Sequence, residues 1–195
     1  MTTRPSVCFF TSSIQNWIES VQKFFSGWGI RTVARGEARY NPMSYHDGSI
    51  WPHDNALIAA GLGRYGHTEA AMTLLTSMFD ASLHFDQHRL PELFCGFPRR
   101  SGEGPTLYPV ACAPQAWAAA TVFAMLQACL GLDIDAPAGQ VSFHAPRLPA
   151  FLDRIELREL RIGEASVDLL LQRYHHNVGV EVIRKRGDVA LQVII

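Results

Sequence analysis

The chain has 195 residues, a formal net charge of −1 and an apolar fraction of 48%. A chain of this length and composition can bury a sizeable core and form one domain, or a domain with an appendage. Its nearly balanced charge gives no reason to expect nucleic acid or an anionic membrane surface as a partner.

The cysteine pattern and the apolar runs bear on where the protein works. The four cysteines are Cys8, Cys95, Cys112 and Cys129, and they follow neither metal-ligand nor redox spacing. Reduced thiols in a cytoplasmic protein are therefore expected. The longest apolar run, residues 116–125, is too short to span a bilayer. We expect a soluble cytoplasmic protein with no membrane partner.

Apolar residues at helical spacing predict four helices. Their expected ranges are 14–25, 53–65, 69–83 and 114–130. Pro52 suits the first turn of the second helix, and Asp54 complements the helix dipole there. The last helix is apolar on nearly all faces, which predicts that it is buried on all sides.

Two long loops separate these helices, at residues 26–51 and 84–113. Loops of this length without regular structure are usually functional. Residues 40–55 contain two Tyr, two His, two Asp, two Asn and one Trp, and lead into an apolar helix. Aromatic faces and hydrogen-bonding groups gathered at the start of a helix suit a sugar-binding cleft.

The period of the apolar residues changes to two after Pro137 and Gly139. This alternation predicts strands around 155–157, 167–171, 178–182 and 189–193. The sequence Arg186-Gly187-Asp188 predicts a hairpin turn between the last two strands. We therefore expect two domains, a helical domain over residues 1–136 and an antiparallel β unit over residues 137–195.

Three ordered segments, 26–32, 40–55 and 91–94, resemble the bacterial amylo-α-1,6-glucosidases and glycogen-debranching-type glycosidases. The first reads Ser-Gly-Trp-Gly-Ile-Arg-Thr and the last reads Pro-Glu-Leu-Phe. The resemblance extends roughly from Phe25 to the C-terminus. It implies a mainly α fold, with a partial (α/α)6 (six-hairpin) barrel followed by a small antiparallel β unit. The predicted helices are too few to close such a barrel.

Inverting hydrolysis of a glycosidic bond needs two carboxyl groups, typically about 6.5–9.5 Å apart, one as general acid and one as general base. The resemblance implies that Glu92 is the general base. We expect its side chain to face the same cavity as Trp51 and the Tyr45–His46 loop, with an Arg or a Tyr hydroxyl as polar partner. The structural alternative is a surface or salt-bridged carboxylate. Asp54 is the competing catalytic carboxylate, although capping of the helix start explains it equally well.

Seven residues are candidates for binding an oligosaccharide or α-glucan substrate: Trp28, Arg31, Tyr45, His46, Trp51, His53 and Asp54. The Trp and Tyr rings would stack on sugar faces. The guanidinium, imidazole and carboxylate groups would bind sugar hydroxyls. Each of these side chains could instead pack in the core or hold the loops together.

The sequence leaves two other functions open. The pairs His46-Asp47, His53-Asp54 and His84/His88 superficially resemble the ligands of a metal-dependent hydrolase. Paired metal ligands normally recur on one helix, whereas these lie in loops or across a helix end. We therefore expect no metal and no cofactor. The second alternative is a non-catalytic carbohydrate-binding remnant.

The resemblance also implies a general acid in a segment similar to Asn-Gln-Gly-Trp-Lys-Asp-Ser, which this sequence does not contain. We therefore expect a truncated hydrolase of α-glucosidic linkages whose isolated chain has little activity. Half a barrel would expose apolar faces that promote association. A second polypeptide, or self-association, is accordingly expected to cover the open barrel face.

Overall fold

The computed structural model describes residues 23–175 and 177–195. Its elements in chain order are α2 (Pro52–Arg64), α3 (Thr68–Ser82), the 3-10 helix η1 (Asp86–His88), α4 (Ala116–Leu130), β1 (Leu132–Asp135), β2 (Gln140–His144), β3 (Arg154–Ile162), β4 (Ala165–Tyr174), β5 (Asn177–Arg186) and β6 (Ala190–Ile194). Three of the predicted helices are confirmed, with ends that differ from the prediction by at most two residues. The predicted helix at 14–25 lies outside the described residues except for its last three positions.

The prediction of a mainly α fold built on a partial (α/α)6 barrel is wrong. The α-helices contain 13, 15 and 15 residues and the strands 4, 5, 9, 10, 10 and 5, so the two contribute about equally to the described chain. The strands form two sheets of three. Helical periodicity located the three helices correctly. The barrel was inferred from similar loop sequences, which do not determine how many helices a chain forms.

The chain divides into two compact units. One comprises Met1–Asn55 and Ser77–Ala119, and the other comprises Ala56–Thr76 and Ala120–Ile195. Each of the three α-helices therefore contributes residues to both units. The first unit contains both long loops, and the second contains both sheets. The domain boundary between residues 136 and 137 stays a prediction.

Proline and glycine mark the ends of the helices. Pro52 opens α2, where its missing N–H costs no helical hydrogen bond. Gly131 follows α4 in the left-handed region, with a φ of 56°. A Cβ at this position would lie 2.0 Å from the carbonyl oxygen of His144 at the end of β2. Only glycine therefore allows the chain to leave α4 and pass so close to β2.

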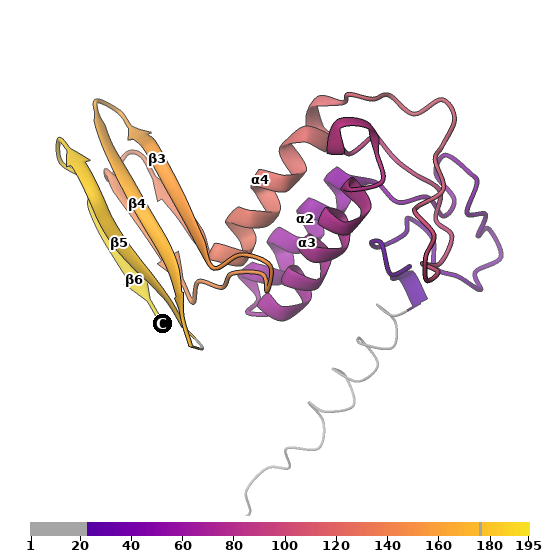
Figure 1. The fold of residues 1–195 in the computed structure, drawn as a ribbon, viewed down its shortest axis with the longest axis horizontal. Helices are drawn as coiled ribbons and strands as arrows, with labels where there is room; N and C mark the ends of the chain where they lie inside the picture. The colour runs from indigo at the N-terminus through magenta and orange to yellow at the C-terminus, as the bar shows by residue number, and fades with distance from the viewer. Residues whose placement is uncertain (1–22, 176) are drawn as a thin grey trace, which may run out of the picture. The chain divides into compact units, whose positions relative to one another are not determined.

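The first sheet has the order β3-β4-β5 and is antiparallel throughout (Figure 1). Its pairing confirms the strands predicted from period-two alternation at residues 155–157, 167–171 and 178–182. Leu169 lies opposite Leu157 on one side and Val182 on the other. Cross-strand apolar pairs of this kind are the main stabilising contacts of a sheet.

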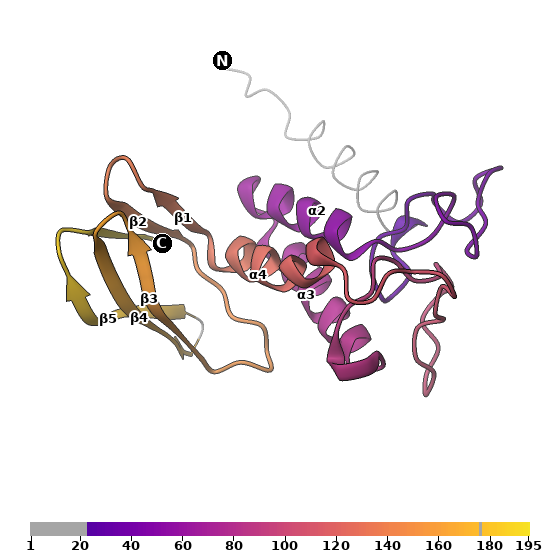
Figure 2. The ribbon, with the colours of Figure 1, turned by 90° about the horizontal axis from the view of Figure 1, so that it is seen from above.

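The second sheet has the order β1-β2-β6, with β1 antiparallel and β6 parallel to β2. Figure 2 shows β1 and β2 lying next to each other. The predicted hairpin at Arg186-Gly187-Asp188 is wrong, because β5 and β6 belong to different sheets. The prediction of a purely antiparallel β unit is also wrong, because β6 pairs parallel to β2. Leu191 pairs with Val141 of β2, which is fully buried, so β6 completes the other sheet instead of extending β5.

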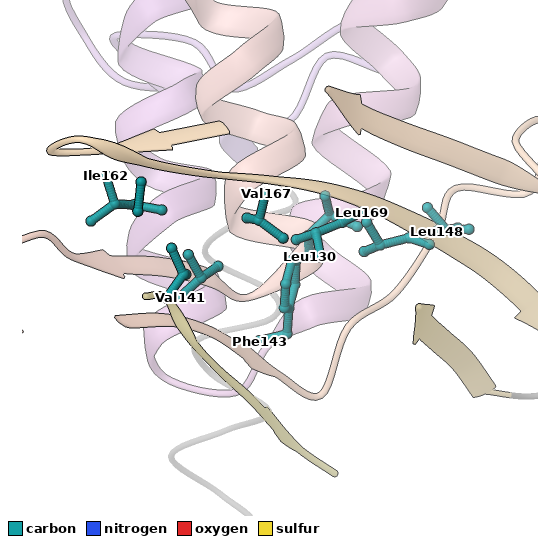
Figure 3. Close-up of a cluster of buried hydrophobic side chains, with 10 residues drawn as sticks. Leu130, Val141, Phe143, Leu148, Ile162, Val167 and Leu169 are labelled. Atoms are coloured by element: carbon teal, nitrogen blue, oxygen red, sulfur yellow. The ribbon is translucent and has the colours of Figure 1, made fainter. Parts of the chain in front are cut away.

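A buried apolar cluster in the second unit consists mainly of side chains from β2 and β4, together with Leu130, Leu148, Ile162 and Val189 (Figure 3). Val141 and Phe143 of β2 and Leu169 of β4 are fully buried. Alternate residues along β4 are buried from Ala165 onward, as expected for a strand with one face in a core. Burying these side chains is the main source of stability for this unit, at about 25 cal/mol per Å² of apolar surface.

No helix in the described ranges combines the length and the apolar character needed to cross a bilayer.

Candidate functional site

The two long loops run side by side within the first unit, joined by an isolated β-bridge between Ile50 and Phe94 (Figure 1). Ile50 of the first loop and Phe94 of the second exchange both backbone hydrogen bonds, with N···O distances of 2.9 and 3.0 Å. Phe94 also bridges to Leu107 further along the second loop. This pairing brings residues 45–49 next to the segment that contains Glu92.

The loops approach so closely at Gly96 that no side chain fits. A Cβ on Gly96 would lie 1.6 Å from the carbonyl oxygen of Gly48. The Gly96 N–H donates to the carbonyl of Pro42 at 2.8 Å, and the Gly96 carbonyl accepts from the hydroxyl of Tyr40 at 3.1 Å. Glycine at this position is therefore a requirement of the loop pairing, and through it of the site.

The carboxylate of Glu92 is held by donors from both loops. The Tyr45 hydroxyl donates to Oε1 at 2.7 Å, and the backbone N–H of Cys112 donates to Oε2 at 3.3 Å. The residue is only 8% exposed. The hydrogen bond from Tyr45, followed by that from Cys112, lowers the pKa of Glu92 below its ordinary value, against the opposing effect of desolvation. The Tyr hydroxyl partner expected from the sequence is therefore present.

Tyr45 is the neutral partner in this pair. Its hydrogen bond to Glu92 raises the pKa of Tyr45 to about 12, so the phenol keeps its proton at neutral pH. The ring lies edge-on to that of Tyr108, with centroids 5.7 Å apart. A carboxylate that stays ionised beside a fixed donor suits a proton acceptor, whereas a general acid needs a raised pKa.

Trp51 packs against the same tyrosine and is 6% exposed. Its ring is edge-to-face with Tyr45 at 4.9 Å and parallel to the imidazole of His46 at 5.7 Å. Its indole N–H donates to Ser49 Oγ at 3.0 Å and to the Tyr45 carbonyl at 3.2 Å. These contacts show that Trp51 supports the loop that presents the Tyr45 hydroxyl. Its stacking on a sugar stays a prediction.

His53 and Asp54 lie in the first turn of α2 beside the Trp51 ring. His53 Nε2 is 3.0 Å from Asp54 Oδ1, and the imidazole stacks on Trp117 with centroids 4.1 Å apart. His53 Nδ1 is buried and has no hydrogen-bond partner in the described part of the chain. Trp117, in the first turn of α4, is 46% exposed. Sequence reasoning did not select Trp117, because a tryptophan in an apolar helix looks like a core residue.

The side chains of Trp28 and Arg31 make their contacts within the loops. Trp28 is 2% exposed, and the guanidinium of Arg99 lies 4.2 Å from its ring centroid. Arg31 is 4% exposed and donates from Nε to the Gly96 carbonyl at 2.5 Å and from Nη1 to the Phe24 carbonyl at 3.2 Å. Burial lowers the pKa of Arg31. These contacts stabilise the loops, and none of them joins either residue to Glu92.

Within residues 23–175 and 177–195, no group of three or more His, Cys, Asp or Glu side chains is arranged to hold a metal ion. The pairs His46-Asp47, His53-Asp54 and His84/His88 are therefore not assembled into a larger ligand set in this part of the chain.

Comparison with known proteins identifies one similar domain. Residues 13–95 match the family described as the mannosylglycerate hydrolase MGH1-like glycoside hydrolase domain. The matched range contains both Tyr45 and Glu92 and covers less than half of the chain. No curated protein matches the chain.

This match supports the broad class of the resemblance found in the sequence, namely glycoside hydrolases. A glycoside hydrolase-like domain suggests glycosidase activity. The narrower resemblance to amylo-α-1,6-glucosidases and debranching enzymes receives no specific support from it.

Proposed function

We propose that this chain carries the base side of a glycoside hydrolase active site, with Glu92 as the carboxylate that activates water. One observation carries the proposal. A buried glutamate within the glycoside hydrolase-like range accepts hydrogen bonds from Tyr45 and Cys112 on two different loops. These donors fix the direction of the carboxylate and keep it ionised, which are the two properties that a general base needs.

In the proposed reaction, Glu92 removes a proton from a water molecule as the water oxygen attacks the anomeric carbon. The bond from that carbon to the leaving oxygen breaks, and a second carboxyl group protonates the leaving oxygen. Tyr45 keeps the Glu92 carboxylate oriented and does not itself lose a proton. The proposed substrate is an α-linked glycoside, an oligosaccharide or α-glucan, and mannosylglycerate is a second substrate to test because of the matched family's description.

Asp54 is poorly placed to be the second carboxyl group. It lies in the first turn of α2 and pairs with His53 at 3.0 Å. Asp54 therefore has its own partner at the helix start, and no hydrogen bond or ion pair of the described chain joins it to the Tyr45–Glu92 pair. We therefore propose that the acid comes from a partner polypeptide or from a longer form of the protein. The isolated chain then has little activity on ordinary glycosides.

Glycosyl fluorides test the role of Glu92 without the general acid, because fluoride leaves without being protonated. The chain is mixed with α-D-glucosyl or α-D-mannosyl fluoride, and fluoride release is followed with an ion-selective electrode. We expect the α-fluoride of one of these sugars to be hydrolysed. Glu92→Gln should reduce the rate by about 10²–10⁴-fold with little change in KM, since general-base catalysis is typically of this size.

Glu103→Gln is the matched control, because Glu103 is an exposed glutamate of the same unit, paired only with Arg100 in the described chain. Its rate should equal that of the wild type. Fluoride release that is equally fast in Glu92→Gln would remove Glu92 from the reaction. No release from either α-fluoride by the folded chain would reject the catalytic proposal and leave a binding role.

A further inference from the structure

A cleft lies next to the segment that carries Glu92. It has a volume of about 470 Å³, and its walls include Pro91 and Leu93. The cleft is also lined by Ala111 and Ala113, which flank Cys112 in the sequence. Neither Glu92 nor Cys112 lines the cleft, so it adjoins the two segments that position the Glu92 carboxylate without including the carboxylate itself.

The lining of the cleft combines polar and apolar residues. Asp86, Gln87 and Arg89 lie within one short stretch of chain, and all three are exposed. Arg89 has no carboxylate within ion-pair distance among the residues described. The aromatic residues Phe85 and Tyr108 also line the cleft. A few hydrogen-bonding groups combined with aromatic and aliphatic side chains are a typical composition for a small-molecule site.

The backbone of the stretch Asp86–Arg89 is strained. Gln87 and His88 are consecutive non-glycine residues in the left-handed region, with φ values of 54° and 55°. The turn is closed by hydrogen bonds from His88 N–H to the Phe85 carbonyl at 3.0 Å and from Arg89 N–H to the Asp86 carbonyl at 3.1 Å. Strain of this kind is concentrated at ligand clamps and active sites. It fixes the direction in which the side chains of the turn leave the backbone.

We propose that this cleft is a second carbohydrate site that binds a pyranose ring. A pyranose offers an apolar C–H face and a rim of hydroxyls, which match the apolar and polar residues that line the cleft. Amide, carboxylate and guanidinium groups such as those of Gln87, Asp86 and Arg89 can each bind two hydroxyls. The volume falls within the range of about 300–1,000 Å³ that is typical of ligand pockets.

The proposed second site does not include Glu92, but its lining contacts residues that position Glu92. Tyr108 lines the cleft, and its ring also contacts Tyr45, the hydrogen-bond partner of Glu92. A sugar in the cleft would therefore contact the two segments that position the Glu92 carboxylate. The proposal goes beyond the glycosidase function, since the cleft would bind sugar even if Glu92 had no catalytic role.

Site-resolved binding of maltotriose by ¹H–¹⁵N NMR tests this proposal. We expect saturable amide shifts at Gln87, Arg89 and Leu107, with a Kd on the order of 1 mM. Arg89→Ala should raise this Kd about tenfold, because a tenfold change corresponds to the loss of roughly one charge-assisted hydrogen bond. Glu92→Gln should leave the shifts at these three amides unchanged, which separates this site from the proposed active site.

Arg100→Ala is the control, because Arg100 is an exposed arginine of the same unit outside this cleft. The same spectra report whether each variant is folded. Shifts confined to residues 45–51, or no saturable shift at about 10 mM maltotriose, ten times the expected Kd, would overturn the proposal. Equal binding by Arg89→Ala and the wild type would also overturn it.

Discussion

The side chain of Asn55 ties the first loop to α2, and its removal should destabilise the unit that contains Glu92. Asn55 is fully buried. Its Oδ1 accepts from Ile30 N–H at 2.7 Å, and its Nδ2 donates to the carbonyls of Ile30 at 3.0 Å and Trp51 at 2.9 Å. Asn55→Ala removes all three bonds and leaves the Ile30 groups without their partner.

The size of the loss follows from the number of bonds. Each intramolecular hydrogen bond contributes about 0.5–1.5 kcal/mol, so three bonds correspond to about 2–4 kcal/mol in the free energy of unfolding. For a chain of this length, 1 kcal/mol shifts Tm by about 2–4 °C. We therefore expect Asn55→Ala to melt roughly 5–15 °C below the wild type in circular dichroism.

Thr73→Ala is the matched control, since it removes one exposed hydrogen bond, from Thr73 Oγ1 to the Glu69 carbonyl at 2.9 Å. Exposed substitutions of this kind change stability by about 0.5 kcal/mol or less. If Asn55→Ala had the same Tm as Thr73→Ala and the wild type, the hydrogen bonds of Asn55 would not be the contacts that hold the first loop to α2.

Four further predictions follow from the loop contacts and the sheet core. The rate of fluoride release should fall as the pH drops through the pKa of Glu92, which lies below its ordinary value of 4.5. Tyr45→Phe removes the hydrogen bond that lowers this pKa most, so the fall in a rate–pH profile should move to higher pH. The lowered pKa of Glu92 also adds to the free energy of unfolding above pH 4.5, and this contribution is lost as the pH falls. Tyr45→Phe should therefore make the free energy of unfolding, measured in urea, less dependent on pH on the acid side. Gly96→Ala should lower Tm sharply in calorimetry, because its Cβ would lie 1.6 Å from the Gly48 carbonyl oxygen, and an unchanged Tm would contradict the loop pairing. Phe143→Ala should cost about 3–5 kcal/mol in urea denaturation, as for other buried aromatic residues, and a loss under 1 kcal/mol would mean that the sheet core is not packed around it.

Local patterns in the sequence predicted most of the elements, because the causes of these elements are themselves local. The period of 3.6 residues and the terminal Pro52 and Gly66 were enough to place α2. Period-two alternation placed β3, β4 and β5. The partner of β6 could not be predicted in this way, since a strand pairs with whichever edge buries its apolar face. That edge is β2, which lies about fifty residues earlier in the sequence.

The site was predictable in part for a related reason. A general base must stay ionised, which predicted an Arg or a Tyr hydroxyl beside Glu92, and Tyr45 is that partner. The burial of Trp28 and Arg31 was not visible in the sequence, because the same side chains serve in binding sites and in loop packing. Trp117 was missed because its contact with His53 joins α4 to α2, which no local pattern reveals.

The proposed catalytic group depends on residues that the family match does not contain. The match ends at Cys95, but the carboxylate of Glu92 also accepts a hydrogen bond from the N–H of Cys112. The Glu92 N–H donates in return to the Cys112 carbonyl at 2.9 Å, so the two segments hold each other in register. A fragment that ended at Cys95 would keep Tyr45 but lose both of these bonds and the Phe94–Leu107 bridge. The smallest unit able to orient Glu92 therefore includes the whole second loop, and a shorter fragment should lose fluoride release even though it retains every matched residue.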